Sequence, residues 1–394
     1  TEYDVKWPSL GGGSRPAIIY ENGGYLCTFD IKTQQAAKVP ITVESDELWS
    51  RPHFLNVQQY VSGFGLSPSG SRAVIEARGE IFTVPAKKGD IRNLTNTSGV
   101  REQQPEWSPD GKSIAYFSDK SGETELYVRP QDGSGDERRI TNDGHALRYG
   151  PEWSPDSKKI LFGEKTMKLF YVDVADGKQV LVAQSDIGRF QNYHWAPDGK
   201  WIVYEAGAEN GYSRIYLYSV DQQKSFPVTD GMTNDRSPSF DRNGKYLYFL
   251  SDRTFSPSFT GFELDMNFNE TTGVYAMTLA ADTANPFAPE SDEEKVASET
   301  PPAGKDQSAQ PEAQKLADAG KDSASAKPED KPEAKPVKVD LDGIEHRVVH
   351  VQVPAGNYVR LTGGKDRIFY MADSESGVAG NGPPVRTLHS FDVS

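Results

Sequence analysis

A repeat of six residues constrains the fold of this 394-residue chain more than any other feature. The repeat reads Trp-Ser-Pro-Asp-Gly-Lys, with variants, and its copies begin at Leu66, Trp107, Trp153, Trp195 and Phe240. Successive copies are therefore 41, 46, 42 and 45 residues apart. A period of about 40–45 residues is typical of β-propeller blades and not of the common helical repeats.

The Pro-Asp-Gly part of each copy predicts a tight turn between two strands. Proline presets one backbone dihedral, aspartate accepts local N–H groups, and glycine supplies a positive φ. Aromatic and β-branched runs follow the turns, as in 114–117 and 246–250, and a third such run comes next, as in 125–128. A short fourth run completes the unit, as in 138–141. Four short strands per unit predict a propeller blade.

We therefore predict an all-β chain that forms one seven-bladed β-propeller of four-stranded antiparallel blades. The predicted blades are residues 3–42, 62–95, 104–141, 150–183, 192–229, 237–353 and 357–394. The last of these lacks an outer strand, and we expect the chain to be a segment of a longer polypeptide because an open strand edge invites pairing or fraying. The alternative is that residues around Tyr3 to Lys6 close the ring as that strand.

Residues 282–338 predict a disordered low-complexity insertion within the sixth blade. The stretch is rich in Ala, Lys, Glu, Asp, Pro and Ser, and has almost no aromatic or β-branched residues after Phe287. Such a composition buries too little apolar surface to offset the entropy of ordering. The insertion falls between the third and fourth strands of its blade, where a long loop adds little to the entropy of closure. It is interpreted as a solubilising tether, or alternatively as a docking arm for a partner.

The charge and cysteine content exclude several classes of partner and site. The formal net charge is −14, which disfavours nucleic acids and anionic membranes. Cys27 is the sole cysteine, so neither an internal disulfide nor a cysteine-based metal site can form. The apolar runs are strand-sized, and no membrane span is expected. We expect a cytoplasmic location, with a periplasmic or exported one if a leader has been removed.

Three further stretches narrow the fold to a family. They are Trp7-Pro-Ser-Leu-Gly-Gly-Gly13 with Tyr20-Glu-Asn-Gly-Gly24, then Glu76 to Ala86, and then Asp340-Leu-Asp-Gly-Ile-Glu345 leading to Tyr358. Together with the repeat, which is also similar to that of TolB-like proteins, they resemble the second propeller of bacterial tricorn-type proteases. The resemblance covers essentially the whole chain.

This resemblance implies a parent serine peptidase with another propeller upstream and a PDZ domain and a catalytic core downstream, and it is compatible with a homo-oligomer of the parent. In that family the seven-bladed propeller is understood as a filter for short peptides. The chain ends before the family's catalytic part, so no catalytic residue can be assigned to it. Whether the chain itself is an enzyme is left open.

A search for other chemistry favours structural roles. The six histidines show no metal-ligand spacing, no Gly-x-Ser-x-Gly motif occurs, and we expect no metal or cofactor. The repeat aspartates Asp110, Asp156 and Asp198 are interpreted as turn formers. The repeat tryptophans are interpreted as packing between blades, although an aromatic ligand cage is the alternative.

Four arginines are the candidate site residues. Arg101, Arg148, Arg189 and Arg236 each precede the anchor aromatic of one blade by four to six residues. The anchor is expected on the innermost strand, so the four guanidiniums would converge on one rim of the central channel. Arginine binds carboxylates in a bidentate manner, so we predict that this rim gates peptides. The alternative is that they pair with Glu106, Glu152, Asp186, Asp235 or a neighbouring blade.

The predicted function is a noncatalytic substrate-access filter of a tricorn-like serine protease that degrades short peptides. The alternative is a TolB-like protein or peptide interaction module. A stand-alone hydrolase is poorly supported because the chain has no nucleophile motif.

Overall fold

The repeated turn joins the innermost strand of each blade to the second strand. In the third blade the N–H of Ser108 donates to Ser113 O over 2.9 Å, and the N–H of Gly111 donates to Ser108 O over 2.8 Å. The Asp110 carboxylate accepts the Ser108 hydroxyl at 2.6 Å and the Lys112 N–H at 3.0 Å. Gly111 has a φ of 75°. The aspartates of the repeat are therefore turn formers, as the sequence predicted.

A computed structural model describes residues 3–12, 16–42, 56–255, 257–259, 266–268, 270–288, 335–374 and 385–393. Its strands form seven consecutive antiparallel sheets, each of four strands except the last, and this confirms the predicted class of seven-bladed all-β propeller. The first four sheets contain β1 (Val5–Leu10), β2 (Ala17–Asn22), β3 (Tyr25–Asp30), β4 (Gln35–Lys38); β5 (Val61–Leu66), β6 (Arg72–Ala77), β7 (Glu80–Pro85), β8 (Arg92–Asn93); β9 (Glu102–Trp107), β10 (Ser113–Ser118), β11 (Glu125–Pro130), β12 (Arg138–Arg139); and β13 (Arg148–Trp153), β14 (Lys159–Glu164), β15 (Lys168–Asp173), β16 (Gln179–Gln184).

The other three sheets contain β17 (Tyr193–Trp195), β18 (Trp201–Gly207), β19 (Ser213–Ser219), β20 (Lys224–Pro227); β21 (Asp235–Phe240), β22 (Tyr246–Asp252), β25 (Thr272–Thr278), β26 (Val348–His350); and β27 (Tyr358–Gly363), β28 (Arg367–Asp373), β29 (Arg386–Asp392). A two-stranded hairpin of β23 (Pro257–Phe259) and β24 (Met266–Phe268), which the sequence did not predict, projects between β22 and β25. The seventh sheet has three strands, as expected.

The low-complexity insertion lies between β25 and β26, as predicted, but its ends are packed. Residues 289–334 lie outside the described part of the chain. Phe287 stacks near Phe391, with ring centroids 6.1 Å apart. The Val337 side chain is buried beside Gly244, and its N–H donates to Asp198 Oδ2 over 2.8 Å. The prediction of disorder over 282–338 was therefore too wide, because apolar side chains hold both ends on the propeller.

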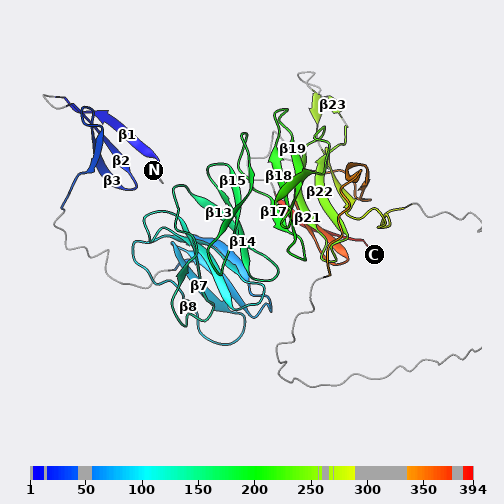
Figure 1. Ribbon diagram of the computed structural model, residues 1–394, viewed down its shortest axis with the longest axis horizontal. Helices are drawn as coiled ribbons and strands as arrows, with labels where there is room; N and C mark the ends of the chain where they lie inside the picture. The colour runs from blue at the N-terminus through cyan, green and yellow to red at the C-terminus, as the bar shows by residue number, and fades with distance from the viewer. Residues whose placement is uncertain are drawn as a thin grey trace, which may run out of the picture.

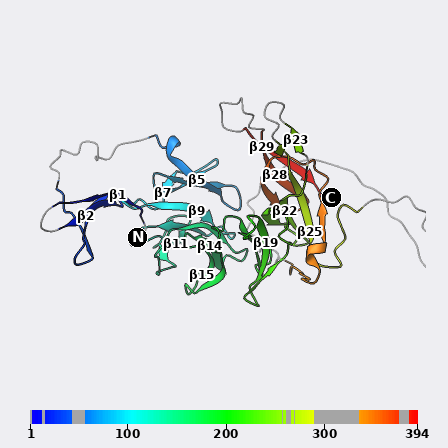
Figure 2. The ribbon, with the colours of Figure 1, turned by 90° about the horizontal axis from the view of Figure 1, so that it is seen from above.

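The first sheet stands at one end of the molecule, apart from the six sheets that follow (Figures 1 and 2). Cys27 is the sole buried residue among its described residues. Val5 pairs with Asn22 on β2, and the Tyr3 hydroxyl donates to Asp119 Oδ2 over 3.1 Å. The alternative that residues around Tyr3 to Lys6 complete the last blade is therefore wrong, because these residues pair with their own hairpin and contact the third blade.

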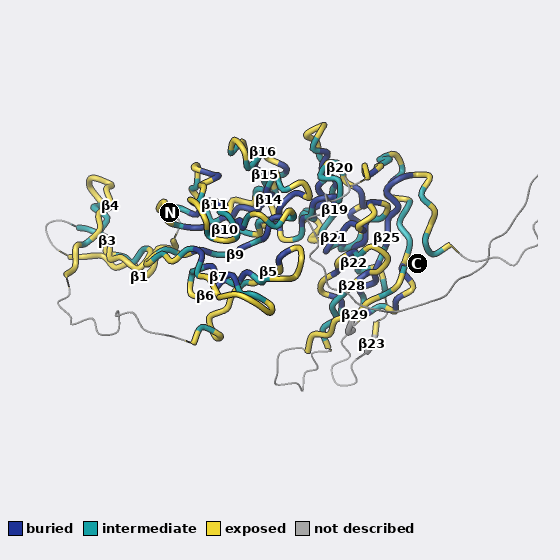
Figure 3. Tube along the Cα trace, turned by 90° about the horizontal axis from the view of Figure 1, so that it is seen from below, coloured by how far each residue is buried: buried dark blue, intermediate teal, exposed yellow. Residues whose placement is uncertain are grey.

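The hydrophobic core is a series of layers between neighbouring blades (Figure 3). Trp153 packs with Phe117 of the preceding blade, and Trp195 packs with Leu161 of the blade before it. Trp107 likewise contacts the core formed with the second blade. These tryptophans are almost fully buried, so the prediction that they pack between blades is confirmed.

Substituting alanine for Gly199 tests the need for glycine in the repeated turn. Gly199 has a φ of +68°, and a Cβ added there would lie 3.7 Å from Pro155 Cδ, an ordinary van der Waals distance. A left-handed alanine costs roughly 1–2 kcal/mol, so Gly199→Ala should lower the free energy of unfolding by that amount in urea titrations. The matched control is Gly188→Ala, where a Cβ meets nothing within 4 Å and φ is not positive. Equal unfolding midpoints for the two variants would contradict this account of the turn.

Candidate functional site: the channel wall and its two mouths

The innermost strand of each blade is an edge strand, so half of its main-chain groups have no partner in their own sheet. The anchors Trp107, Trp153 and Trp195 each pair with an isoleucine of the second strand of their blade. The residue just before each anchor therefore has the same register position in each of these blades. We call the residues at this position the pre-anchor residues. On five consecutive blades they are Glu106, Glu152, His194, Ser239 and Thr362.

Pre-anchor side chains bind the exposed edge of the next blade. The N–H of Trp153 donates to Glu106 Oε2 over 3.1 Å, and its indole N–H donates to Glu106 O over 3.3 Å. Trp195 makes the same pair of bonds to Glu152, at 2.9 and 3.2 Å. We call this arrangement the interblade clasp. Its carboxylates satisfy N–H groups that the edge strand would otherwise leave unpaired.

Two other blades have a smaller pre-anchor residue, a serine in the sixth blade and a glycine in the second. The Gly363 N–H on β27 donates to Ser239 Oγ over 3.0 Å. The second blade has Gly65 at the pre-anchor position, and the indole nitrogen of Trp107 has no hydrogen-bond partner within the described residues. The main-chain N–H bond of the clasp thus depends on the side chain that stands before the anchor, whereas the indole bond goes to a main-chain carbonyl.

A second tier of bonds joins the innermost strands three residues before the anchor. Gln104, Gly150 and Ser237 hold this position with φ of 53°, 63° and 53°, at bulges in their strands. Their N–H groups donate to Glu76 Oε2 at 2.8 Å, to Gln104 Oε1 at 2.6 Å and to Glu205 Oε2 at 2.6 Å. Each acceptor belongs to the preceding blade, so two tiers of hydrogen bonds link the wall from blade to blade.

Glu152 also orients an imidazole. His194 Nδ1 donates to Glu152 Oε2 over 2.9 Å, and no described residue is hydrogen-bonded to His194 Nε2. Withdrawal from bulk water disfavours the imidazolium, but the charge and hydrogen bond of Glu152 outweigh it and raise the pKa of His194. Burial, and then repulsion from Glu152, raise the pKa of Glu106 well above its usual range.

Two cavities follow the innermost strands. One of about 490 Å³ is lined by residues of four successive blades, including Phe64, Gln104, Pro151 and Gln191. The other, of about 1110 Å³, lies where the repeated turns end the innermost strands. We call that side the turn mouth and the opposite side, where the loops enter these strands, the loop mouth. The turn-mouth cavity is lined by Pro109, Glu152, Trp153, Pro155, Asp156, His194, Trp195, Pro197, Asp198, Lys200, Ser239, Phe240, Asp241, Arg242 and Pro336.

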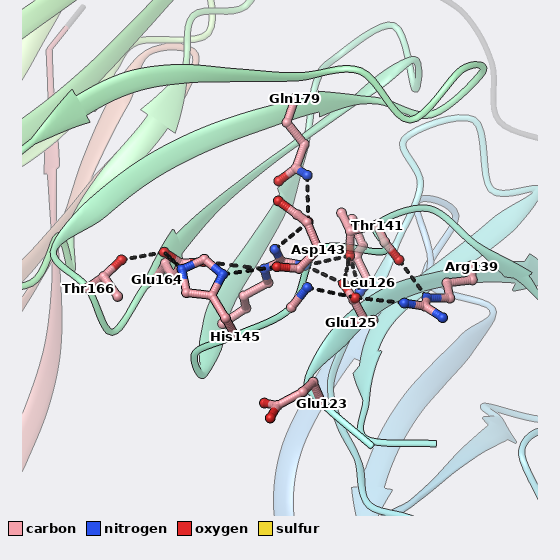
Figure 4. Close-up of polar contacts among 12 residues, drawn as sticks. Glu123, Glu125, Leu126, Arg139, Thr141, Asp143, His145, Glu164, Thr166 and Gln179 are labelled. Atoms are coloured by element: carbon pink, nitrogen blue, oxygen red, sulfur yellow. Dashed lines mark hydrogen bonds and ion pairs between the residues drawn. The ribbon is translucent and has the colours of Figure 1, made fainter. Parts of the chain in front are cut away.

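Arg148 does not face solvent, which corrects the prediction that it contributes to an exposed rim. Its side chain is 1% exposed and forms ion pairs with Glu125, with Asp143 at 2.7 Å and with Glu164 at 3.7 Å. Figure 4 shows these three carboxylates converging from neighbouring elements. Burial alone would raise the pKa of Asp143, but hydrogen bonds from Arg148 and Gln179 outweigh it and lower the pKa. Arg148 thus locks the third blade to the fourth.

Of the other three arginines, one is paired and two are exposed. Arg236 is 27% exposed and binds Asp252 Oδ1 at 3.1 Å and the Tyr358 carbonyl of the next blade at 3.0 Å. Arg101 and Arg189 are exposed, and Arg101 lines a cavity of about 430 Å³ at the loop mouth together with Tyr3. No two of the four guanidiniums share a hydrogen-bond partner among the described residues. The predicted gate is thereby reduced to Arg101 and Arg189.

Sequence reasoning missed the Glu152–His194 pair and the cations Lys200 and Arg242 at the turn mouth. The signal was present in the repeat itself, because the residue before each anchor aromatic varies between Glu, His and Ser while the turn stays constant. His194 was interpreted as an ordinary polar strand position, since sequence spacing does not show that a carboxylate of another blade lies beside it.

The remaining described residues show neither a serine–histidine pair nor a metal-binding cluster. None of the described histidines is hydrogen-bonded to a serine, and no cluster of three or more His, Cys, Asp or Glu residues among them could hold a metal ion. In the described part of the chain no helix is long and apolar enough to cross a membrane.

The fold and the wall define a seven-bladed β-propeller. A family model, the tricorn protease second beta propeller domain, matches residues 61–394, and the chain belongs to this family. It is 24% identical over 394 residues to the putative tricorn-like protease C-terminal subunit of Sulfurisphaera tokodaii, covering 100% of this chain and 40% of that protein. It is 23% identical over 354 residues to the tricorn protease homolog of Saccharolobus solfataricus, covering 90% of this chain and 29% of the relative.

The crystal structure of the tricorn protease has the same fold. It superposes with a TM-score of 0.67 at 18% identity, covering 100% of this chain and 35% of that one. The chain thus spans less than half the length of each of these proteins, and it corresponds to a propeller segment of a larger tricorn-type protease.

Substituting Arg148 tests whether its ion pairs hold the third and fourth blades together. Arg148→Ala removes the one buried cation that Glu125 and Glu164 share, both of them 1% exposed, and leaves Glu125 with the part-exposed Arg139 at 2.9 Å and Glu164 with His145 at 3.8 Å. We expect a loss of about 3–5 kcal/mol in the free energy of unfolding, measured by denaturant titration, because unpaired buried charges are costly. Arg189→Ala, at an exposed position, should change it by less than about 0.5 kcal/mol.

A double variant separates loss of the charge pair from general damage. Arg148→Met combined with Glu125→Gln should recover part of the stability that Arg148→Met alone loses, since fewer buried charges remain unpaired. An effect of Arg148→Ala as small as that of Arg189→Ala would contradict the lock.

Proposed function

We propose that this chain is the noncatalytic substrate-access filter of a tricorn-like serine protease that degrades short peptides. The observation that carries the proposal is the wall of the innermost strands, which two tiers of hydrogen bonds hold together from blade to blade. A wall whose width is fixed in this way can exclude folded chains while it admits extended ones. The family membership supports the same role, because the relatives that this chain resembles are named as tricorn proteases.

The lining of the wall suits peptides of varied sequence. The cavity of about 490 Å³ presents the amides of Gln104 and Gln191 and the rings of Pro105 and Pro151. Amide groups donate and accept hydrogen bonds with any peptide backbone, and proline rings offer apolar contact without charge. At the loop mouth, the exposed guanidiniums of Arg101 and Arg189 would favour the entry of acidic peptides.

Binding of unfolded peptides tests the proposal directly. We expect the purified chain to bind labelled peptides of five to ten residues and unrelated sequence, with weak affinities that differ little, in fluorescence anisotropy titrations. A small folded protein labelled in the same way should not bind. Gln191→Trp should weaken peptide binding because the larger side chain fills the lining, whereas Gln222→Trp on an outer turn should not.

Two results would contradict the filter. Binding that Gln191→Trp leaves unchanged would place peptides elsewhere on the molecule. Tight binding of a single sequence would instead indicate a protein or peptide interaction module.

A further inference from the structure

The cavity at the turn mouth has more free hydrogen-bond donors than free acceptors. Its volume is about 1110 Å³, and its charged lining residues are Glu152, Asp156, Asp198 and Asp241 with His194, Lys200 and Arg242. A count of formal charges would favour a cationic ligand, since four groups are acidic and three are basic. The hydrogen bonds that these groups already make lead to the opposite result.

Each carboxylate of the cavity is occupied by the protein itself. Glu152 accepts the N–H of Trp195 and the imidazole of His194. Asp156 accepts the Lys158 N–H at 3.1 Å and the Ser154 hydroxyl at 2.6 Å.

The other two carboxylates bind only main-chain N–H groups. Asp198 accepts those of Lys200 at 3.0 Å and of Val337 at 2.8 Å. Asp241, which is 2% exposed, accepts the N–H groups of Asn243, Lys245 and Tyr246. Both oxygens of Glu152, Asp198 and Asp241, and one oxygen of Asp156, are therefore engaged before any ligand arrives.

The donors are not engaged. Neither the Lys200 ammonium nor the Arg242 guanidinium has a hydrogen-bond or ion-pair partner among the described residues, and both residues are exposed. The third donor is His194 Nε2, which is fixed in direction by the Nδ1 bond to Glu152 and is otherwise unpartnered within the described part of the chain. Two unpartnered cations, together with an imidazole nitrogen that donates when His194 is protonated, therefore lie in one cavity lined by proline rings.

We propose that the turn-mouth cavity binds the terminal carboxylate of a short peptide through His194 Nε2, Lys200 and Arg242. Arginine and imidazolium both form charge-assisted hydrogen bonds to carboxylate oxygens. The proline and aromatic walls accommodate the last side chains of the peptide, and the volume is ample for several residues. This inference rests on the proposed function and specifies which end of the peptide the propeller holds and at which mouth.

Proton binding at His194 controls the strength of the site. Nε2 donates only when the imidazole is protonated, and the raised pKa of His194 extends that state toward neutral pH. The charges around the ring belong to Glu152, Glu205 and Arg360, in addition to the residues that line the cavity. Affinity for a carboxylate should therefore fall as the pH rises through the pKa of His194.

The test compares three peptides of one apolar sequence. The first has a free C-terminal carboxylate, the second a C-terminal amide, and the third a C-terminal amide with one internal glutamate. We expect the free acid to bind the chain at least about tenfold more tightly than either amide, the effect of one or two charge-assisted hydrogen bonds. The preference should shrink as the pH is raised, in step with the titration of the His194 ring followed by NMR.

Variants with matched controls locate the site. Lys200→Gln with Arg242→Gln should abolish the preference for the free acid without changing the thermal transition, since both side chains are exposed. Lys112→Gln with Lys158→Gln should leave the preference intact, because these exposed lysines hold the equivalent turn positions of the third and fourth blades and do not line the cavity.

Three outcomes would overturn the site, and they differ in what they say about the filter. Equal binding of acid and amide would refute the carboxylate site but leave the filter standing. Equal binding of the free acid and the amidated glutamate peptide would refute a site for the terminus. Absence of binding by all three peptides would count against both the site and the filter.

Discussion

The structure depends on how a ring of edge strands satisfies its exposed main-chain N–H groups. The innermost strand of a blade has a partner on one side only, and an N–H group left unpaired there would cost about as much as a lost hydrogen bond. The interblade clasp removes that cost, because Glu106 and Glu152 accept the N–H groups of Trp153 and Trp195. The rings of the same tryptophans pack against the preceding blade, so each tryptophan makes both a polar and an apolar contact across its blade boundary.

The clasp also determines the charge of the channel. Glu106 and Glu152 already accept N–H groups of the next blade, and burial raises the pKa of Glu106. The two mouths therefore differ: exposed arginines remain at the loop mouth, and an oriented histidine with two unpartnered cations remains at the turn mouth. An acidic chain thus presents basic groups along its axis, a distribution that net charge does not reveal.

The repeat was enough to predict five of the seven blades, the turn chemistry and the packing of the tryptophans, since each depends on local sequence, while the first and last blades were predicted from strand-like runs outside the repeat. The fates of the four arginines could not be predicted, because Arg148 meets Glu125 and Glu164 only when strands of two blades come together. The same holds for His194 and Glu152, which are 42 residues apart in the chain. The range predicted to be disordered, 282–338, was too wide at its C-terminal end because the burial of Val337 depends on a glycine of another hairpin.

Hydrogen exchange at the Trp195 main-chain amide tests the clasp most directly. Glu152→Ala removes the acceptor of this N–H group but leaves the Trp153 amide bound to Glu106. A hydrogen bond to a charged group contributes about 1.5–3 kcal/mol, so the variant should speed exchange at Trp195 by at least tenfold while exchange at Trp153 stays nearly constant. Unchanged exchange at Trp195 would show that the N–H group is protected by other means, and the clasp would not be what holds the wall together.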